Sequence, residues 1–263
     1  MSGNDRAVEE QRWNDAQLDA AVDTPRIRLW RHERAAIVLG RAQHALAAEP
    51  AIVLPAAIPL VTRQAGGGAV LVGRWLLSLS VALPAAHRLV AGRSIAASYD
   101  WIAAAFVAAL AQVDVRARAA DDAVACKAPP DLAWACFAGI TAGEVLVDGR
   151  KLVGLAQRRT RHGVLVVAGL LLDTVPWRLL RDGMPGAVRS SEAERQVAAM
   201  ADATIDLRTA RALDGARAPS AFAVGQPSEP AHDRIVARLV ERLVDEIGSA
   251  LGEPGTLDCT VYA

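Results

Sequence analysis

The chain has 263 residues and a mass of 27.7 kDa, which is enough to bury a substantial hydrophobic core. Hydrophobic residues make up 52% and charged residues 22%, a balance that excludes a disordered chain. Lys and Arg together number 29, as do Asp and Glu, so no net charge attracts nucleic acid or an anionic membrane, and we expect neither partner.

The cysteines and the polar N-terminus indicate a cytoplasmic protein. Cys126, Cys136 and Cys259 form no CxxC pair and suit a reducing compartment. Residues 1–11 lack the apolar core of a secretory signal. The most apolar runs, such as 164–172, fall short of the roughly 18 residues that a membrane helix needs, so we expect no membrane span.

The N-terminal third predicts a helix followed by strands. A helix is expected over 8–21, and strands over 26–31 and 35–39. In the segment 77–83, leucine and valine alternate with serine and alanine, which is the period of a strand with one buried face. Pro84 ends that strand.

The middle of the chain predicts a helix and then a hairpin. After Ser94, which is a good cap, apolar residues recur every three or four positions, so this helix should pack on a sheet. A strand over 144–147 leads to Asp148-Gly149, a dipeptide typical of tight hairpin turns, and the return strand starts at Lys151. The helical stripe consists of Tyr99, Ile102, Phe106, Leu110 and Val113.

The C-terminal part predicts a central strand and further helices. Segment 164–172 is apolar on both faces and should lie at the centre of a sheet. Ser191 with Glu194 forms a capping-box pattern before a helix over 196–203. An amphipathic helix is expected around 228–251, packed on the domain or, alternatively, forming a dimer contact.

This order of elements predicts an α+β fold: a mixed, largely antiparallel sheet with flanking helices. No internal repeat or long linker divides the chain, so a single domain over residues 1–263 is expected. The chain lacks GxxxxGK[ST], HExxH and GxSxG motifs, and its five histidines have no ligand spacing, so no metal site is predicted.

A glycine-rich segment is the first candidate site. Three glycines, Gly66 to Gly68, let backbone N–H groups approach an anion or a carbonyl, and Arg63 offers a planar fork for phosphate or carboxylate. The alternative for the glycines is a flexible loop or a bulge at a strand edge.

The second candidate site surrounds Lys151, one of only two lysines. On a regular strand, Lys151 and Gln157 share one face, while Gly154 and Ala156 share the other, where another backbone or an acyl chain could approach closely. Alone, Lys151 is typical of a solvated hairpin residue, and Cys136 of a small buried residue.

Together, three motifs resemble the biotin/lipoate protein ligase superfamily, in its branch of lipoate-protein ligases and cysteine-dependent octanoyltransferases. The resemblance extends over about 12–207. The motifs are Gly40-Arg41-Ala42-Gln43, the segment from Arg63 to Val70, and the segment from Gly149 to Gln157.

The resemblance implies a biotin/lipoate ligase catalytic domain with an acyl-chain tunnel along the glycine loop. It implies that Lys151 reaches the acyl carbonyl or its activated phosphate, and that lipoate or octanoate is the acyl substrate. The implied substrate-binding residues are Arg63, Gly66, Gly67, Gly68, Ala69, Gly154, Ala156 and Gln157.

Two chemistries occur in the family that the chain resembles. Transferases take octanoate from acyl carrier protein through a cysteine thioester and need no cofactor, and the Cys136-Phe137 pair before the lysine motif resembles theirs. Ligases use ATP and Mg to form an acyl-adenylate, and the third glycine, Gly68, resembles theirs more closely. Both modify a lysine on a lipoyl carrier domain or a protein like the glycine cleavage H protein.

The chain departs from the family pattern at two positions. Val72 and Ala168 stand where family members commonly carry histidine. The expected activity is transfer of an octanoyl or lipoyl group through Cys136, with ATP-dependent ligation as one alternative. A non-catalytic protein that binds an acyl group or a carrier is the other.

Overall fold

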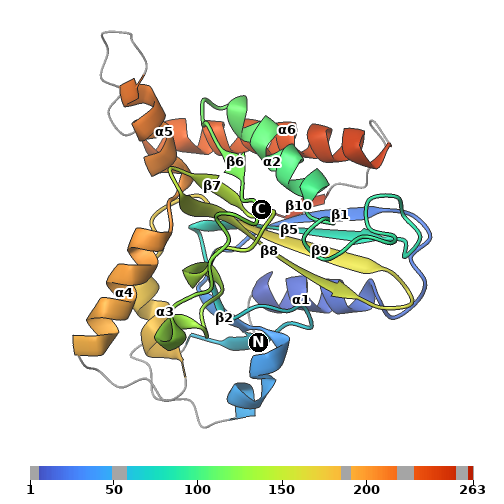
Figure 1. Cartoon of the computed structure of the whole chain (residues 1–263), viewed down its shortest axis with the longest axis horizontal. Coiled ribbons are helices and arrows are strands. Elements are labelled where there is room, and N and C mark those ends of the chain that lie inside the picture. Colours follow the sequence, from blue (N-terminus) through green and yellow to red (C-terminus); the bar gives the residue numbers. More distant parts are fainter. Residues whose placement is uncertain (1–5, 49–57, 185–190, 218–227, 253–259, 263) are drawn as a thin grey trace.

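A computed structural model of the chain describes residues 6–48, 58–184, 191–217, 228–252 and 260–262 (Figure 1). The helices are α1 (Arg6–Ala16), α2 (Asp100–Ala111), α3 (Trp177–Gly183), α4 (Ser191–Ala203), α5 (Leu207–Arg217) and α6 (Glu229–Leu251), with short 3-10 helices η1 (Arg41–Ala48), η2 (Pro130–Leu132) and η3 (Cys136–Ala138). The strands are β1 (Arg26–Arg31), β2 (Ala36–Leu39), β3 (Leu60–Thr62), β4 (Val70–Val72), β5 (Leu76–Leu83), β6 (Arg118–Ala119), β7 (Val145–Val147), β8 (Arg150–Arg159), β9 (Val164–Leu171) and β10 (Thr260–Tyr262).

Two sheets organise the described residues. The larger has seven strands in the order β10-β1-β5-β9-β8-β7-β6, and its pairs are antiparallel except β1 with β10. In the smaller sheet, β2 pairs with β3 in parallel and with β4 antiparallel. The prediction of a mixed, largely antiparallel α+β fold is confirmed. The expected strands 26–31 and 35–39 form as β1 and β2, but they belong to different sheets.

Both faces of β5 are covered, so the prediction of a half-buried strand is wrong. All eight residues from Leu76 to Leu83 are buried. Helices α2 and α6 lie on one side of the large sheet and α1 on the other (Figure 1). The serines are buried because their hydroxyls find partners: Trp30 Nε1 donates to Ser80 Oγ at 3.2 Å, and His32 Nε2 lies 2.9 Å from Ser78 Oγ.

Two predicted helices form with shifted ends. Ser94 Oγ accepts a hydrogen bond from the backbone N–H of Ala97 at 3.1 Å and so caps a turn, while α2 itself begins at Asp100. Helix α1 ends at Ala16 because the following residues form turns, in which the N–H of Leu18 donates to the carbonyl of Asp15. Leu18 then packs against β5 and β9 residues.

The predicted hairpin and central strand are confirmed. Asp148 and Gly149 have φ values of 51° and 76°, so both occupy the left-handed region that the tight turn between β7 and β8 requires. Strand β9 pairs with β5 on one side and β8 on the other, at the middle of the large sheet.

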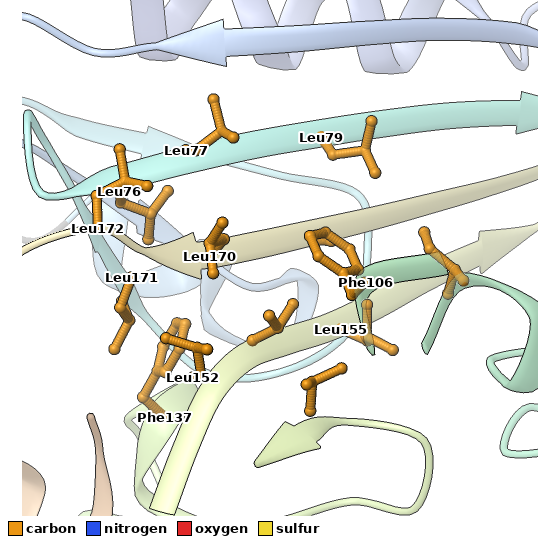
Figure 2. Packing of buried hydrophobic residues seen from close by; sticks show 14 of the residues in the cluster. Leu76, Leu77, Leu79, Phe106, Phe137, Leu152, Leu155, Leu170, Leu171 and Leu172 are labelled. Carbon is orange, nitrogen blue, oxygen red and sulfur yellow. The ribbon is translucent and has the colours of Figure 1, made fainter. Parts of the chain in front are cut away.

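The main hydrophobic core lies between the large sheet and its helices. Leucines from β5, β8 and β9 pack with Phe106 of α2 and with Phe137 (Figure 2). The amphipathic helix α6 packs against α2, as the first of its two sequence interpretations predicts (Figure 1). No helix in the described part of the chain is both long enough and apolar enough to cross a bilayer.

Leu79→Ala tests this core. Leu79 is 1% exposed on β5, so its truncation should lower the free energy of unfolding by about 2–5 kcal/mol through lost burial and a residual cavity. The matched control is Leu179→Ala on α3, where the side chain is 38% exposed and the change should stay within about 0.5 kcal/mol. Urea denaturation measures both, and equal effects would contradict the described packing.

Candidate functional site

Arg63 organises the glycine loop that connects β3 with β4. Its Nη2 donates to the carbonyls of Gly66 at 3.0 Å and Gly68 at 2.7 Å, and its Nη1 donates to the Val38 carbonyl at 3.2 Å. The guanidinium is buried. Its donors are therefore committed to the backbone, so Arg63 shapes the loop and does not present the open fork for phosphate that the sequence suggested.

The motif Gly40-Arg41-Ala42-Gln43 packs directly against this loop. A Cβ atom on Gly40 would lie 1.8 Å from the carbonyl oxygen of Gly67, so only glycine allows the two backbones to approach. Gln43 accepts a hydrogen bond from the Gly40 N–H at 3.2 Å and donates to the Trp134 carbonyl at 2.9 Å. The motif thus joins β2, the glycine loop and the segment before Cys136.

The glycine loop places Cys136. The N–H of Ala69 donates to the Trp134 carbonyl at 2.7 Å, and the N–H of Cys136 donates to the Ala69 carbonyl at 3.0 Å. A Cβ on Gly68 would collide with the Trp134 carbonyl at 2.4 Å, which explains the third glycine. On Gly67, whose φ is 89°, a Cβ would lie 3.3 Å from Cys136 Sγ, so the thiol lies beside the loop.

Lys151 is buried in an ion pair. Its side chain is 1% exposed, and Nζ lies 2.8 Å from Glu144 Oε2 and 3.0 Å from the Cys136 carbonyl oxygen, to which it donates. Glu144 also accepts hydrogen bonds from the N–H groups of Thr141 at 2.8 Å and Leu155 at 3.3 Å. The ammonium therefore ties β8 to the peptide of Cys136, and it is not the solvated hairpin lysine that its position alone suggested.

A register shift changes the faces expected for β8. Lys151 pairs with Leu146, whereas Val153 pairs with Val145, so β8 carries one extra residue at this point. Strict alternation from Lys151 onward is therefore wrong. Lys151 Nζ lies 5.4 Å from the centre of the Phe137 ring, and a Cβ on Gly154 would lie 3.2 Å from the same ring.

A cavity of about 60 Å³ lies between the large sheet, the small sheet and α1. Four predicted site residues border it: Arg63, Cys136, Gly154 and Ala156. The other predicted site residues do not border it: Lys151, Gly66, Gly67, Gly68, Ala69 and Gln157. The Gln157 side chain instead bonds with Ser98 Oγ and the Ile95 carbonyl. The remaining bordering residues are Glu10, Gln11, Val38, Val70, Val72, Leu76, Ser78, Phe137, Leu155, Val167, Ala168 and Gly169.

The walls of the cavity are mostly apolar. Both positions at which the chain departs from the family pattern, Val72 and Ala168, border it. Across the sheet, Ser78 pairs with Gly169, which pairs with Gly154, so small residues follow one another over three strands. These features suit an acyl chain in contact with the sheet backbone.

Sequence reasoning missed the acidic residues of this region. Glu144 begins the strand expected over 144–147, and its only sequence signal was a carboxylate at the edge of a hydrophobic run. Glu10 lies on α1 and borders the cavity, and burial raises the pKa of its carboxyl to about 7. No periodic pattern connects either residue with the lysine or glycine motifs. No group of three metal-ligating side chains occurs among the described residues.

Comparison with known proteins agrees with this arrangement. Residues 6–206 match the family described as the lipoyl protein ligase A/B catalytic domain, and the chain belongs to this family. At the level of the family, this membership supports the transfer or ligation of a lipoyl or octanoyl group to a carrier. No curated protein sequence matches the chain.

Solved structures show the same fold. One is a bipartite lipoate protein ligase with its E2 lipoyl domain from Thermoplasma acidophilum, at 16% identity and a TM-score of 0.64, covering 100% of this chain and 85% of that one. A putative lipoate protein ligase from T. acidophilum with bound lipoic acid has 18% sequence identity and a TM-score of 0.60, and the match covers 100% of this chain and 86% of that one. A lipoate-protein ligase A bound with ATP has 17% sequence identity and a TM-score of 0.56, and the match covers 97% of this chain and 83% of that one.

Gly40→Ala tests the close approach beneath the loop. The new methyl group would overlap the Gly67 carbonyl, so the variant should lose about 1–3 kcal/mol of stability through overpacking. Gly66→Ala is the matched control, because nothing lies within 4 Å of its Cβ position, and it should unfold as the wild type does. Thermal unfolding measures both, and a stable Gly40→Ala variant would contradict this geometry.

Lys151→Met tests the buried ion pair. It leaves Glu144 charged and without its cation, so stability should fall by about 3–5 kcal/mol. Adding Glu144→Gln should recover part of the loss, because it removes the unpaired charge, although the single amide oxygen can accept only one of the two backbone bonds that Thr141 and Leu155 donate to different carboxylate oxygens. Lys127→Met, at the exposed second lysine, is the control. Denaturant titrations of the wild type, the two single variants and the double variant measure these stabilities. If Lys151→Met is as stable as the wild type, the buried ion pair is refuted.

Proposed function

We propose that the protein transfers an octanoyl or lipoyl group to the ε-amine of a lysine on a lipoyl carrier domain, through a thioester on Cys136. The observation that carries this proposal is the position of Cys136. Its half-buried side chain borders the cavity and lies beside Gly67, while its own carbonyl is held by Lys151.

In the first step, the Cys136 sulfur attacks the carbonyl carbon of an acyl thioester. A bond forms between Cys136 sulfur and that carbon, the bond to the donor sulfur breaks, and the donor leaves as a thiol with the proton that Cys136 gives up. The acyl chain occupies the apolar cavity, against Gly154 and Ala156. In the second step, the carrier amine attacks the same carbon, forms the amide and returns a proton to the Cys136 sulfur.

Lys151 acts on both steps from beneath Cys136. An ammonium has three hydrogens, and its bonds to Glu144 and to the Cys136 carbonyl use two of them. The third polarises the acyl carbonyl on Cys136 and stabilises the negative charge that develops on its oxygen. Glu144 keeps the ammonium in position. The glycine loop, from Gly66 to Ala69, holds the Cys136 segment against the cavity.

The partners follow from this chemistry and from the related structures. The bipartite ligase of T. acidophilum was solved with an E2 lipoyl domain, which supports a lipoyl carrier domain as acceptor here, or a protein like the glycine cleavage H protein. Acyl carrier protein is the thioester donor that we propose. Cys126 and Cys136 are free thiols, and we place the protein in the reducing cytoplasm.

The residues favour a thioester donor over ATP. One related ligase binds ATP. In this chain, however, the Arg63 guanidinium is already committed to backbone carbonyls of the glycine loop. A nucleotide-dependent step would need other cations to hold the phosphates. The transferase mechanism needs none, because the leaving group is a thiol.

The test is acylation of the purified protein by octanoyl acyl carrier protein. Intact-mass spectrometry should detect one octanoyl group on the wild type and none on Cys136→Ala. Cys126→Ala is the matched control, because Cys126 is an exposed free thiol outside the cavity, and it should be acylated like the wild type. Adding a lipoyl carrier domain should then move the octanoyl group to the carrier lysine.

Two outcomes would overturn the proposal. If the carrier is modified only with ATP and free octanoate, and Cys136→Ala is equally active, the protein is an ATP-dependent ligase. If neither donor modifies protein or carrier, it is a binding protein without this activity.

A further inference from the structure

A group of buried polar side chains borders one end of the cavity. We call this group the polar corner. It consists of Glu10 on α1, His32 after the end of β1, and Ser78 on β5, which are 5%, 3% and 5% exposed. His32 Nε2 lies 2.9 Å from Ser78 Oγ and 3.4 Å from Glu10 Oε2. Glu10 and Ser78 border the cavity directly. An acyl site that takes only hydrocarbon has no use for such a corner, since burying these groups costs free energy.

The corner has unused hydrogen-bonding capacity. Glu10 Oε2 has no hydrogen-bond partner within the described part of the chain, although it is buried. Buried carboxyl oxygens in folded proteins are almost always hydrogen-bonded, so an unpartnered one that borders a cavity indicates a ligand group that completes it. Gln11, the next residue on α1, also borders the cavity and adds an amide.

The protonation of the corner suits a neutral polar ligand. Burial raises the pKa of Glu10 to about 7, while the nearby Ser78, Arg63 and Gln11 oppose that rise. Burial lowers the pKa of His32 to about 4, with a smaller contribution from Arg6, so the imidazole is neutral. The corner therefore offers acceptors to a hydroxyl or thiol and does not present a full charge that would require an ionic partner.

Ser78 of the corner and the Cys136 segment border the cavity at strands two spacings apart in the large sheet. Ser78 pairs with Gly169 and Gly169 with Gly154, so Ser78 and Gly154 are separated by two strand spacings, or about 10 Å. Phe137, the neighbour of Cys136, covers Gly154. Apolar side chains such as Leu76 and Val167 form further parts of the walls.

We propose that the cavity accepts a medium-chain acyl group whose last carbons carry a hydroxyl or thiol, and that Glu10 selects it by accepting a hydrogen bond from that group. This inference rests on the proposed function, because it places the carboxyl end of the ligand at Cys136. It adds the chemical class of the distal end, which the apolar walls alone do not specify.

The test compares two acids of equal size, 8-hydroxyoctanoic acid and nonanoic acid, which differ in a terminal hydroxyl or methyl group. Calorimetric titration of the wild type should give a preference of about tenfold for the hydroxy acid, the size expected of one buried hydrogen bond. Glu10→Leu should reverse the preference, because the acceptor is replaced by an apolar group. Glu10→Gln keeps an acceptor oxygen and should retain the preference for the hydroxy acid.

The outcomes separate this inference from the proposed function. If the wild type binds nonanoic acid as tightly as the hydroxy acid, or if Glu10→Leu keeps the wild-type preference, the inference is wrong and the acyl site stands. If neither acid binds to the wild type, both this inference and the proposed acyl site are wrong. Binding of nonanoic acid to Glu10→Leu also demonstrates that this variant is folded.

Discussion

The site depends on the need of one buried ammonium for acceptors. Lys151 is almost completely enclosed, and a charge in that position is tolerated only when it is paired and hydrogen-bonded. Glu144 supplies the opposite charge, and the carbonyl of Cys136 supplies a further acceptor. Because these two acceptors come from β7's edge and from η3, the same interaction that satisfies the charge also fixes the thiol relative to the sheet.

Arg63 plays a corresponding part on the other wall. Its guanidinium bonds to carbonyls of Gly66, Gly68 and Val38, so the glycine loop is held in shape by a cation that is itself satisfied by backbone. Two buried cations thus shape the region around Cys136.

The polar and apolar residues that border the cavity are unevenly distributed. Val72 and Ala168 leave part of the wall apolar, whereas Glu10 and Ser78 introduce polarity at another point. The burial of Glu10, His32 and Lys151 costs free energy, which distinguishes this region from a purely apolar core.

Much of the fold, and part of the site, could be predicted from the sequence. Local periodicity identified β5, β9 and α2, the Asp148-Gly149 turn needed no tertiary information, and the glycine and lysine motifs indicated the family. Such signals depend on neighbouring residues, because helix and strand periods repeat over a few positions. They did not indicate the small sheet, the burial of both faces of β5, or the extra residue in β8.

The sequence by itself determined the α+β class and the family, and it indicated Cys136 and Lys151 as candidate site residues. Only the tertiary structure decided that Glu144 neutralises Lys151, that Arg63 binds backbone, and that Glu10 meets His32 and Ser78. His32 and Ser78 are 46 residues apart, and Arg63 and Val38 are 25 apart. Contacts over such separations leave no periodic trace, because they arise when packed layers bring buried polar groups together and each group must find a partner.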